Sequence, residues 1–207
     1  MVFRHLLPMA RERCFRKRRE NWRSLFLPTL IFLMLAPAFC VPQQTALDLD
    51  GKTVNPIKSN AGQLVVLVFV RDDCPVSGRY APTIQRISEE HRKDARFYLV
   101  FPDKSESPSD IRKYLRDFRY SIPGLRDPEH ALVKEARAQI TPEAAVFDAK
   151  GALVYHGRID NLYEAFGRTR SAPTTHELED AIAAALAGRP PSNAQVAGVG
   201  CYISDLQ

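Results

Sequence analysis

The sequence predicts an α/β protein with a mostly parallel central sheet, helices on both faces and an antiparallel hairpin at one edge. Three observations lead to this fold class. Residues 64–70 and 95–101 are mostly apolar runs, which are typical of strands buried on both faces. Apolar residues at helical spacing follow each run, as expected for crossover helices. Farther along the chain, residues 148–151 form a turn between two short apolar segments, which predicts a hairpin.

Turn and cap residues define the boundaries of these elements. Asp50-Gly51 indicates a hairpin turn in the lead-in at 41–60. Pro75 and Pro108 stand where a first helical turn accepts proline, and Pro123-Gly124 closes the second helical unit. The expected elements are a strand at 64–70, a helix from Pro75 that carries Tyr80, Ile84, Ile87 and His91, a strand at 95–101, a helix from Pro108, a short helix at 129–139, strands at 144–147 and 152–156, and a helix at 175–186 capped by Thr174 or Thr175.

The 207 residues accommodate one domain of common size with extensions at both ends. Residues 41–188 contain all the expected helices and strands and form the domain. Residues 189–207 begin with Arg189-Pro190-Pro191 and continue with small residues, which predicts a flexible tail carrying Cys201.

Residues 1–40 have the organisation of a secretory signal. Residues 1–23 hold eight of the 29 basic side chains and two of the 24 acidic ones, and an apolar run at 25–35 follows. Ala36-Pro37-Ala38 then matches an A-x-A cleavage site, so the sequence predicts export to the periplasm or another extracytoplasmic compartment. The alternative is a retained membrane anchor, because an uncleaved segment from 25 to 41 approaches the ~17 residues that can span a bilayer.

The charge distribution argues against a nucleic-acid partner. The net charge is +5, but it comes from residues 1–23, and the rest of the chain is close to neutral and lacks a basic surface for phosphates. The sequence contains no phosphate-binding glycine loop, so we expect no cofactor. Its five histidines do not have the spacing of metal ligands, so we expect no metal site.

Of the four cysteines, Cys14 and Cys40 lie in the targeting segment, which leaves Cys74 and Cys201. Two widely separated cysteines do not form the framework of a disulfide-stapled small domain. Cys74 follows the strand at 64–70 after three intervening residues, at the sheet edge where parallel α/β proteins bind ligands. A thiol at a helix N-terminus meets free N–H groups and the positive end of the helix dipole, which favour the thiolate. Cys74 is therefore the candidate nucleophile; the alternative is an inert buried cysteine.

Charged residues flank the candidate nucleophile on both sides. Arg71 and Arg79 would stabilise a thiolate at Cys74, whereas Asp72 and Asp73 would oppose it. The sequence alone leaves the sign of the summed field open.

At this point a family resemblance becomes clear. A strand followed by Cys74-Pro75-Val76-Ser77 and a helix, with Thr141-Pro142 before a hairpin, resembles the thioredoxin-like superfamily. The segments 73–82, 125–128 and 155–160 are more narrowly similar to bacterial redoxin proteins of the AhpC/TSA type. The resemblance covers about residues 45–205, and it implies a thioredoxin-like fold and a redox-active or antioxidant thiol.

The resemblance also implies a substrate-binding site. In that superfamily the proline that matches Pro142 is cis, lies beside the active cysteine, and has neighbouring backbone groups that bind a partner chain. Thr141, Pro142 and Ser77 are therefore the expected substrate-binding residues. Ser77 stands where thioredoxins carry their second cysteine, so a local disulfide cannot form. Cys201 is the remaining thiol that could resolve an intermediate on Cys74; the alternatives are an independent thiol or pairing with another chain.

The favoured function is that of a thiol–disulfide oxidoreductase. Its partners would be protein thiols or disulfides, or a small oxidant, together with an external thiol reductant. A peroxidase is the first alternative, with Arg126 or Arg158 stabilising the thiolate. However, Leu67 and Arg71 occupy the places where the family's peroxidases carry a proline and a threonine or serine.

Two further alternatives involve no catalysis. Exported copper-assembly proteins share this fold, but they use two cysteines in the first loop and a histidine just before the later strand. This chain has one cysteine in that loop and Ile140-Thr141-Pro142 at the histidine's place, and His156 lies farther along. The last alternative is a redox-inactive module that binds a partner in the groove near Pro142.

Overall fold

The computed structural model describes residues 44–58, 62–204 and 206 of the chain. The expected signal or anchor at residues 1–40 lies outside the described residues. Within the described ranges, no helix is both long enough and apolar enough to cross a membrane.

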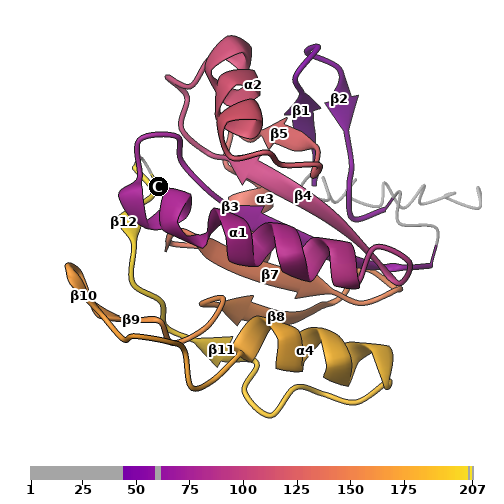
Figure 1. Cartoon of the computed structure of the whole chain (residues 1–207). Helices are drawn as coiled ribbons and strands as arrows, with labels where there is room; N and C mark the ends of the chain where they lie inside the picture. Colours follow the sequence, from indigo (N-terminus) through magenta and orange to yellow (C-terminus); the bar gives the residue numbers. More distant parts are fainter. Residues whose placement is uncertain (1–43, 59–61, 205, 207) are drawn as a thin grey trace, which may run out of the picture. The chain divides into compact units, whose positions relative to one another are not determined.

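A twisted sheet of eight strands forms the centre of the described chain (Figure 1). Its strands are, in spatial order, β11 (Gln195–Val196), β8 (Leu153–Gly157), β7 (Glu143–Phe147), β3 (Leu64–Phe69), β4 (Ala95–Phe101), β5 (Gly124–Arg126), β1 (Ala46–Asp48) and β2 (Thr53–Val54). The central strands β3, β4 and β5 are parallel, and the hairpin β7–β8 is antiparallel to β3 as predicted. The hairpin β1–β2, with its turn at Asp50-Gly51, extends the opposite edge.

Helices cover both faces of this sheet. They are α1 (Pro75–Glu90), α2 (Pro108–Asp117), α3 (Ala131–Ala136) and α4 (Glu177–Leu186). Helices α1, α2 and α4 pack on one face and α3 packs on the other. This arrangement confirms the predicted α/β architecture.

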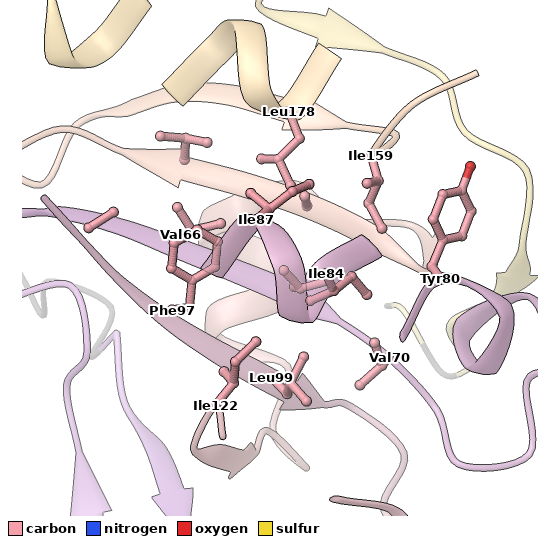
Figure 2. Packing of buried hydrophobic residues seen from close by; sticks show 14 of the residues in the cluster. Val66, Val70, Tyr80, Ile84, Ile87, Phe97, Leu99, Ile122, Ile159 and Leu178 are labelled. Carbon is pink, nitrogen blue, oxygen red and sulfur yellow. The ribbon is translucent and has the colours of Figure 1, made fainter. Parts of the chain in front are cut away.

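Strand β3 is the centre of the core, and all six of its residues are buried. Because side chains alternate along a strand, Val66 and Val68 contribute to one cluster and Val65 and Leu67 to the other. Figure 2 shows the first cluster, in which Ile84 and other residues of α1 lie against β3 and β4. The prediction of a strand buried on both faces is therefore confirmed.

Local sequence explains where two helices begin. Helix α1 starts at Pro75, a position at which the missing N–H costs nothing. Helix α2 follows Ser107, whose hydroxyl accepts from the Asp110 N–H while the Asp110 carboxylate accepts from the Ser107 N–H. This reciprocal pair is a capping box.

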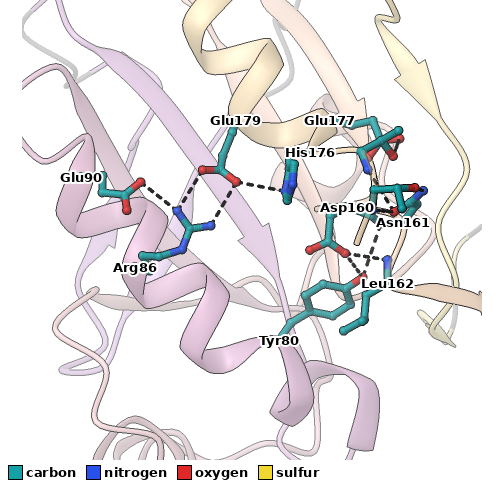
Figure 3. A network of polar contacts seen from close by, with 11 residues as sticks. Tyr80, Arg86, Glu90, Asp160, Asn161, Leu162, His176, Glu177 and Glu179 are labelled. Atoms are coloured by element: carbon teal, nitrogen blue, oxygen red, sulfur yellow. Dashed lines mark hydrogen bonds and ion pairs between the residues drawn. The ribbon is translucent and has the colours of Figure 1, made fainter. Parts of the chain in front are cut away.

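The expected cap of the last helix is wrong. Helix α4 begins at Glu177, and its N-cap residue is His176 rather than Thr174 or Thr175. The backbone N–H groups of both threonines donate to the Asn161 side chain, so Asn161 holds this segment in a loop. Figure 3 shows Asn161 beside the start of α4.

Several short strands were not predicted, because two or three residues show no periodicity. Strand β5 lies where Pro123-Gly124 indicated only the end of a unit. The others are β6 (Ile140–Thr141), the hairpin β9 (Tyr163–Ala165) and β10 (Arg168–Thr169), and β11 and β12 (Cys201–Tyr202) in the C-terminal segment. Residues 189–204, expected to be a flexible tail, thus carry two strands.

Candidate active site

Cys74 is positioned by the central strand β3 and the long helix α1. It is the N-cap residue of α1, one short loop after β3, and its residue is 2% exposed. The loop is held from two sides, because the Asp72 N–H donates to Glu106 Oε1 at 2.7 Å and the Arg71 N–H to Ser77 Oγ at 3.4 Å. The fold therefore presents this sulfur at a helix N-terminus, as the sequence predicted.

The Thr141-Pro142 segment lies directly beside this sulfur. Its peptide bond is cis, and Thr141 O lies 3.2 Å from Cys74 Sγ, close enough to accept from the protonated thiol. The Glu143 carboxylate accepts from the N–H groups of Gln139 and Ile140 at 2.8 and 3.2 Å. These two contacts fix the course of β6.

The C-terminal segment brings Cys201 to the same place. Strand β11 runs parallel to β8, and β12 then pairs antiparallel with β6, with Cys201 opposite Thr141. In Figure 1 this last segment of the chain lies beside the first turn of α1. Both cysteines are free, and their sulfur atoms are 2.7 Å apart. Residues 127 positions apart in the sequence thus form one dithiol site.

The two thiols differ in acidity. Burial acts to raise the pKa of Cys74, but hydrogen bonds from Cys201 and Ser77 outweigh it and bring that pKa below its ordinary value. Burial and the contact with Cys74 raise the pKa of Cys201 to about 11. The first proton to leave therefore comes from Cys74, and the Cys201 thiol donates to the thiolate that remains.

Ser77 belongs to this site by its contacts. Its residue is completely buried in the first turn of α1, and both its N–H and its hydroxyl lower the pKa of Cys74. In this structure its contacts are made within the loop around the sulfur. Its expected contact with substrate stays a prediction, as does that of Thr141 and Pro142.

The three arginines proposed as thiolate-stabilising residues have other surroundings. Arg79 is exposed on α1, and Arg126 is half-buried at the end of β5. Arg158 pairs with Glu177, and its Nε donates to Glu177 Oε1 at 3.0 Å. The charge of Arg71 does act on the sulfur pair, since it lowers the pKa of Cys201. Stabilisation of the thiolate by the other three stays a prediction.

Two site residues escaped the sequence analysis. Glu106 precedes α2 and reaches back to the loop before Cys74, a contact for which the sequence gives no signal. Gly200 lies so close to β6 that an added Cβ would stand 2.2 Å from Thr141 O. A glycine directly before a cysteine was the available signal, since glycine marks close backbone approach.

Polar contacts fix helix α1 beyond its first turn (Figure 3). The Tyr80 hydroxyl donates to Asp160 Oδ1 at 2.6 Å, which ties the first half of the helix to the loop after β8. Farther along, Arg86 pairs with Glu179 of α4 at 2.9 Å. Cys74 therefore sits on a helix that is anchored at two points.

The described residues contain no group of three or more His, Cys, Asp and Glu side chains that could hold a metal ion. His156 is buried on β8, where its Nδ1 lies 3.5 Å from Glu143 Oε1. The structure thus places His156 beside a carboxylate of β7.

The comparison with known families agrees with this arrangement. The model of the AhpC/TSA family matches residues 34–156, which is more than half of the chain. The chain belongs to the AhpC/TSA family. This AhpC/TSA protein has a thioredoxin-like fold, and the family and the dithiol site together support a thiol–disulfide redox function.

Solved structures give a similar result for the fold. An uncharacterized conserved protein from Geobacillus kaustophilus is 23% identical, with 77% of this chain and 86% of that chain covered and a TM-score of 0.66. A hypothetical protein from Sinorhizobium meliloti is 19% identical, with 77% and 88% covered and a TM-score of 0.65. These likenesses concern the fold alone. Comparison with curated proteins gives no match.

Proposed function

We propose that this AhpC/TSA protein is a thiol–disulfide oxidoreductase in which Cys74 is the nucleophile and Cys201 resolves the mixed disulfide. The observation that carries the proposal is the 2.7 Å separation of the two sulfur atoms. At this distance the pair can change between dithiol and disulfide with little movement of the chain. The difference in pKa supports these roles, since the thiolate is the attacking species.

The reaction has two exchange steps. Cys74 attacks a disulfide of the substrate, a bond forms between Cys74 and one substrate sulfur, and the other substrate sulfur leaves as a thiolate and takes a proton. Cys201 then loses its proton and attacks Cys74 Sγ, which forms the Cys74–Cys201 disulfide and releases the second substrate sulfur. The substrate gains two electrons, and an external thiol reductant restores the dithiol while it is itself oxidised to a disulfide.

Trapping with a small disulfide tests this proposal. The full chain is prepared with Cys14→Ser and Cys40→Ser, so that Cys74 and Cys201 are its only thiols, and it is treated with oxidised glutathione. We expect peptide mapping by mass spectrometry to find a Cys74–Cys201 disulfide and no stable adduct. With Cys201→Ser added, the glutathione adduct on Cys74 should accumulate because nothing resolves it.

The matched control is Cys74→Ser in the same background, which should form no intramolecular link. Absence of a Cys74–Cys201 disulfide in the parent chain, together with no adduct in the Cys201→Ser chain, would contradict the proposal.

A peroxidase is the second candidate, favoured by the family itself. A peroxide would oxidise Cys74 to a sulfenic acid, and condensation with the nearby Cys201 would release water and give the same disulfide. Leu67 and Arg71 weaken this candidate, because they stand where the family's peroxidases carry a proline and a threonine or serine, so the hydroxyl that would orient the peroxide is missing. Consumption of hydrogen peroxide no faster than by a free thiol would eliminate it.

Export is proposed from residues 1–40 alone. Periplasmic or other extracytoplasmic location, with or without retention of residues 25–41 as an anchor, is tested by cell fractionation and N-terminal sequencing of the mature chain. Recovery of the intact chain in the cytoplasm would contradict it.

A further inference from the structure

Strand β6 has one edge that is satisfied by the protein's own C-terminal segment. In the described chain, β6 and β12 form a separate two-stranded sheet. The Ile203 N–H donates to Gln139 O at 3.0 Å, and the Thr141 hydroxyl lies 3.4 Å from Cys201 O, which accepts from it. Such main-chain pairing depends little on side-chain identity, so an extended segment of another chain could replace β12.

Glycine at positions 198 and 200 lets the C-terminal segment lie close to β6. A Cβ on Gly200 would lie 2.2 Å from Thr141 O and 2.8 Å from the Thr141 carbonyl carbon, both of them backbone atoms. A Cβ on Gly198 would lie 3.1 Å from Ile140 Cδ1. The residue just before the cysteine must therefore be glycine for this close approach, and the same restriction would apply to any chain that enters in this register.

Apart from its sulfur contact, the segment is held mainly by short main-chain pairings with β8 and β6. Its two strands have two residues each, and Tyr202 is 80% exposed. Ile203 is its one buried hydrophobic residue among those described. In the dithiol form these contacts can open at low cost, whereas a Cys74–Cys201 disulfide would fasten the segment covalently.

We propose that the C-terminal tail, residues 192–204, is a tethered internal ligand whose residues 201–203 occupy β6, and that the partner is an extended polypeptide carrying a cysteine preceded by glycine. The proposal rests on the proposed function and specifies its substrate class. The partner and the tail bind the same edge of β6 in turn. This edge is therefore accessible to a polypeptide when Cys74 and Cys201 are reduced, and it is covered by the tail when they form a disulfide.

The alternation couples binding to chemistry. The tail leaves β6, the partner strand pairs there, and its disulfide is attacked by Cys74, which releases the partner's other sulfur as a thiol. When the partner's strand leaves β6 while still bonded to Cys74, the tail returns and brings Cys201 within reach. Cys201 then forms its bond to Cys74 and releases the partner's second sulfur, so the partner is reduced by two electrons and the protein is oxidised.

A peptide copied from the tail tests this proposal on the full chain. The probe is a fluorescein-labelled peptide of residues 194–204 with Cys201 replaced by serine, and binding is measured by fluorescence anisotropy. We expect Gly200→Val protein to bind the probe at least tenfold more tightly than reduced wild type, because a tethered tail competes at about millimolar effective concentration. Oxidised wild type should bind at least tenfold more weakly than reduced wild type.

Two matched controls distinguish docking of the probe on β6 from nonspecific effects of a substitution or of the peptide. Ala197→Val adds volume to an exposed position of the same segment and should bind the probe as wild type does. A second probe with alanine in place of Gly200 should bind at least tenfold more weakly than the first to every protein. If circular dichroism shows that Gly200→Val does not fold, Ile203→Ala replaces it, because this change loosens the tail without adding volume.

Equal affinity of the reduced, oxidised and tail-loosened proteins for the probe would overturn the proposal, as would equal binding of the two probes. These outcomes leave the proposed function intact if the Cys74–Cys201 disulfide still forms. Conversely, if no such disulfide forms, the proposed function fails, while the comparison of Gly200→Val with reduced wild type still decides whether the tail covers β6.

Discussion

The two cysteines of the site are held by regions of very different construction. Cys74 stands between a fully buried six-residue strand and a sixteen-residue helix, and Glu106 and Ser77 bind the loop before it. Cys201 is carried by a segment with two strands of two residues each. The core therefore fixes the nucleophile, whereas the partner thiol is carried by a segment that can detach without unfolding the core.

The largest effect on stability is expected at Glu143, which holds β6, the strand that pairs with the C-terminal segment. Glu143 is buried, and one of its oxygen atoms accepts from the N–H groups of Gln139 and Ile140. Glu143→Ala leaves both donors without this acceptor, so we expect a loss of about 2–4 kcal/mol in the free energy of unfolding. Urea denaturation measures it.

Glu143→Gln is the matched control, since its amide oxygen can accept from the same donors, and it should cost about 1 kcal/mol or less. Equal losses for the two variants would show that the hydrogen bonds to β6 are not what Glu143 contributes.

A smaller and more local effect is expected in the tail. Ile203→Ala removes the tail's buried side chain and should weaken tail docking by about 1–2 kcal/mol. In native-state hydrogen exchange, the Ile203 N–H, which donates to Gln139 O, should exchange roughly tenfold faster or more.

Amides of β3 serve as the internal control, because a tail that opens on its own leaves their exchange unchanged. If β3 and Ile203 amides accelerate together, the tail unfolds with the core, and the contrast between the two regions is lost.

The same contrast explains what the sequence could predict. The buried runs at 64–70 and 95–101 gave β3 and β4 nearly to the residue, and Cys74 followed from its place between β3 and α1. Long elements bury enough apolar surface to impose a visible period on their residues. The half of the site that contains Cys74, between β3 and α1, was therefore predictable.

The C-terminal half of the site, with strands β11 and β12, was not predictable apart from Cys201 itself. Strands β11 and β12 exist because β8 and β6 offer them partners, and two residues show no period of their own. The fit of Gly200 depends on a backbone atom of Thr141, which is distant in the sequence. The same holds for Glu106, whose role comes from a contact with the Asp72 backbone rather than from its neighbours in the chain.

A further expected effect on stability depends on pH and concerns Glu106, which binds the loop before Cys74. Burial, with smaller contributions from Asp72 and Asp103, raises the pKa of Glu106 to about 8 from an ordinary value of 4.5. The folded protein therefore holds this proton more tightly than the unfolded chain. Stability from the neutral carboxyl is fully present below pH 4.5 and is lost as the pH rises through 8.

Glu106→Gln keeps an acceptor for the Asp72 N–H but cannot ionise. Its free energy of unfolding should match that of wild type near pH 4 and exceed it at pH 6 by about 2 kcal/mol, because one pKa unit corresponds to about 1.4 kcal/mol. Urea denaturation at the two pH values measures the difference, and Glu129→Gln, on the exposed surface, reports the effect of removing one carboxylate elsewhere. A constant difference across this range would mean that Glu106 is not buried as a neutral acid, and the loop before Cys74 would then be less firmly fixed than its contacts imply.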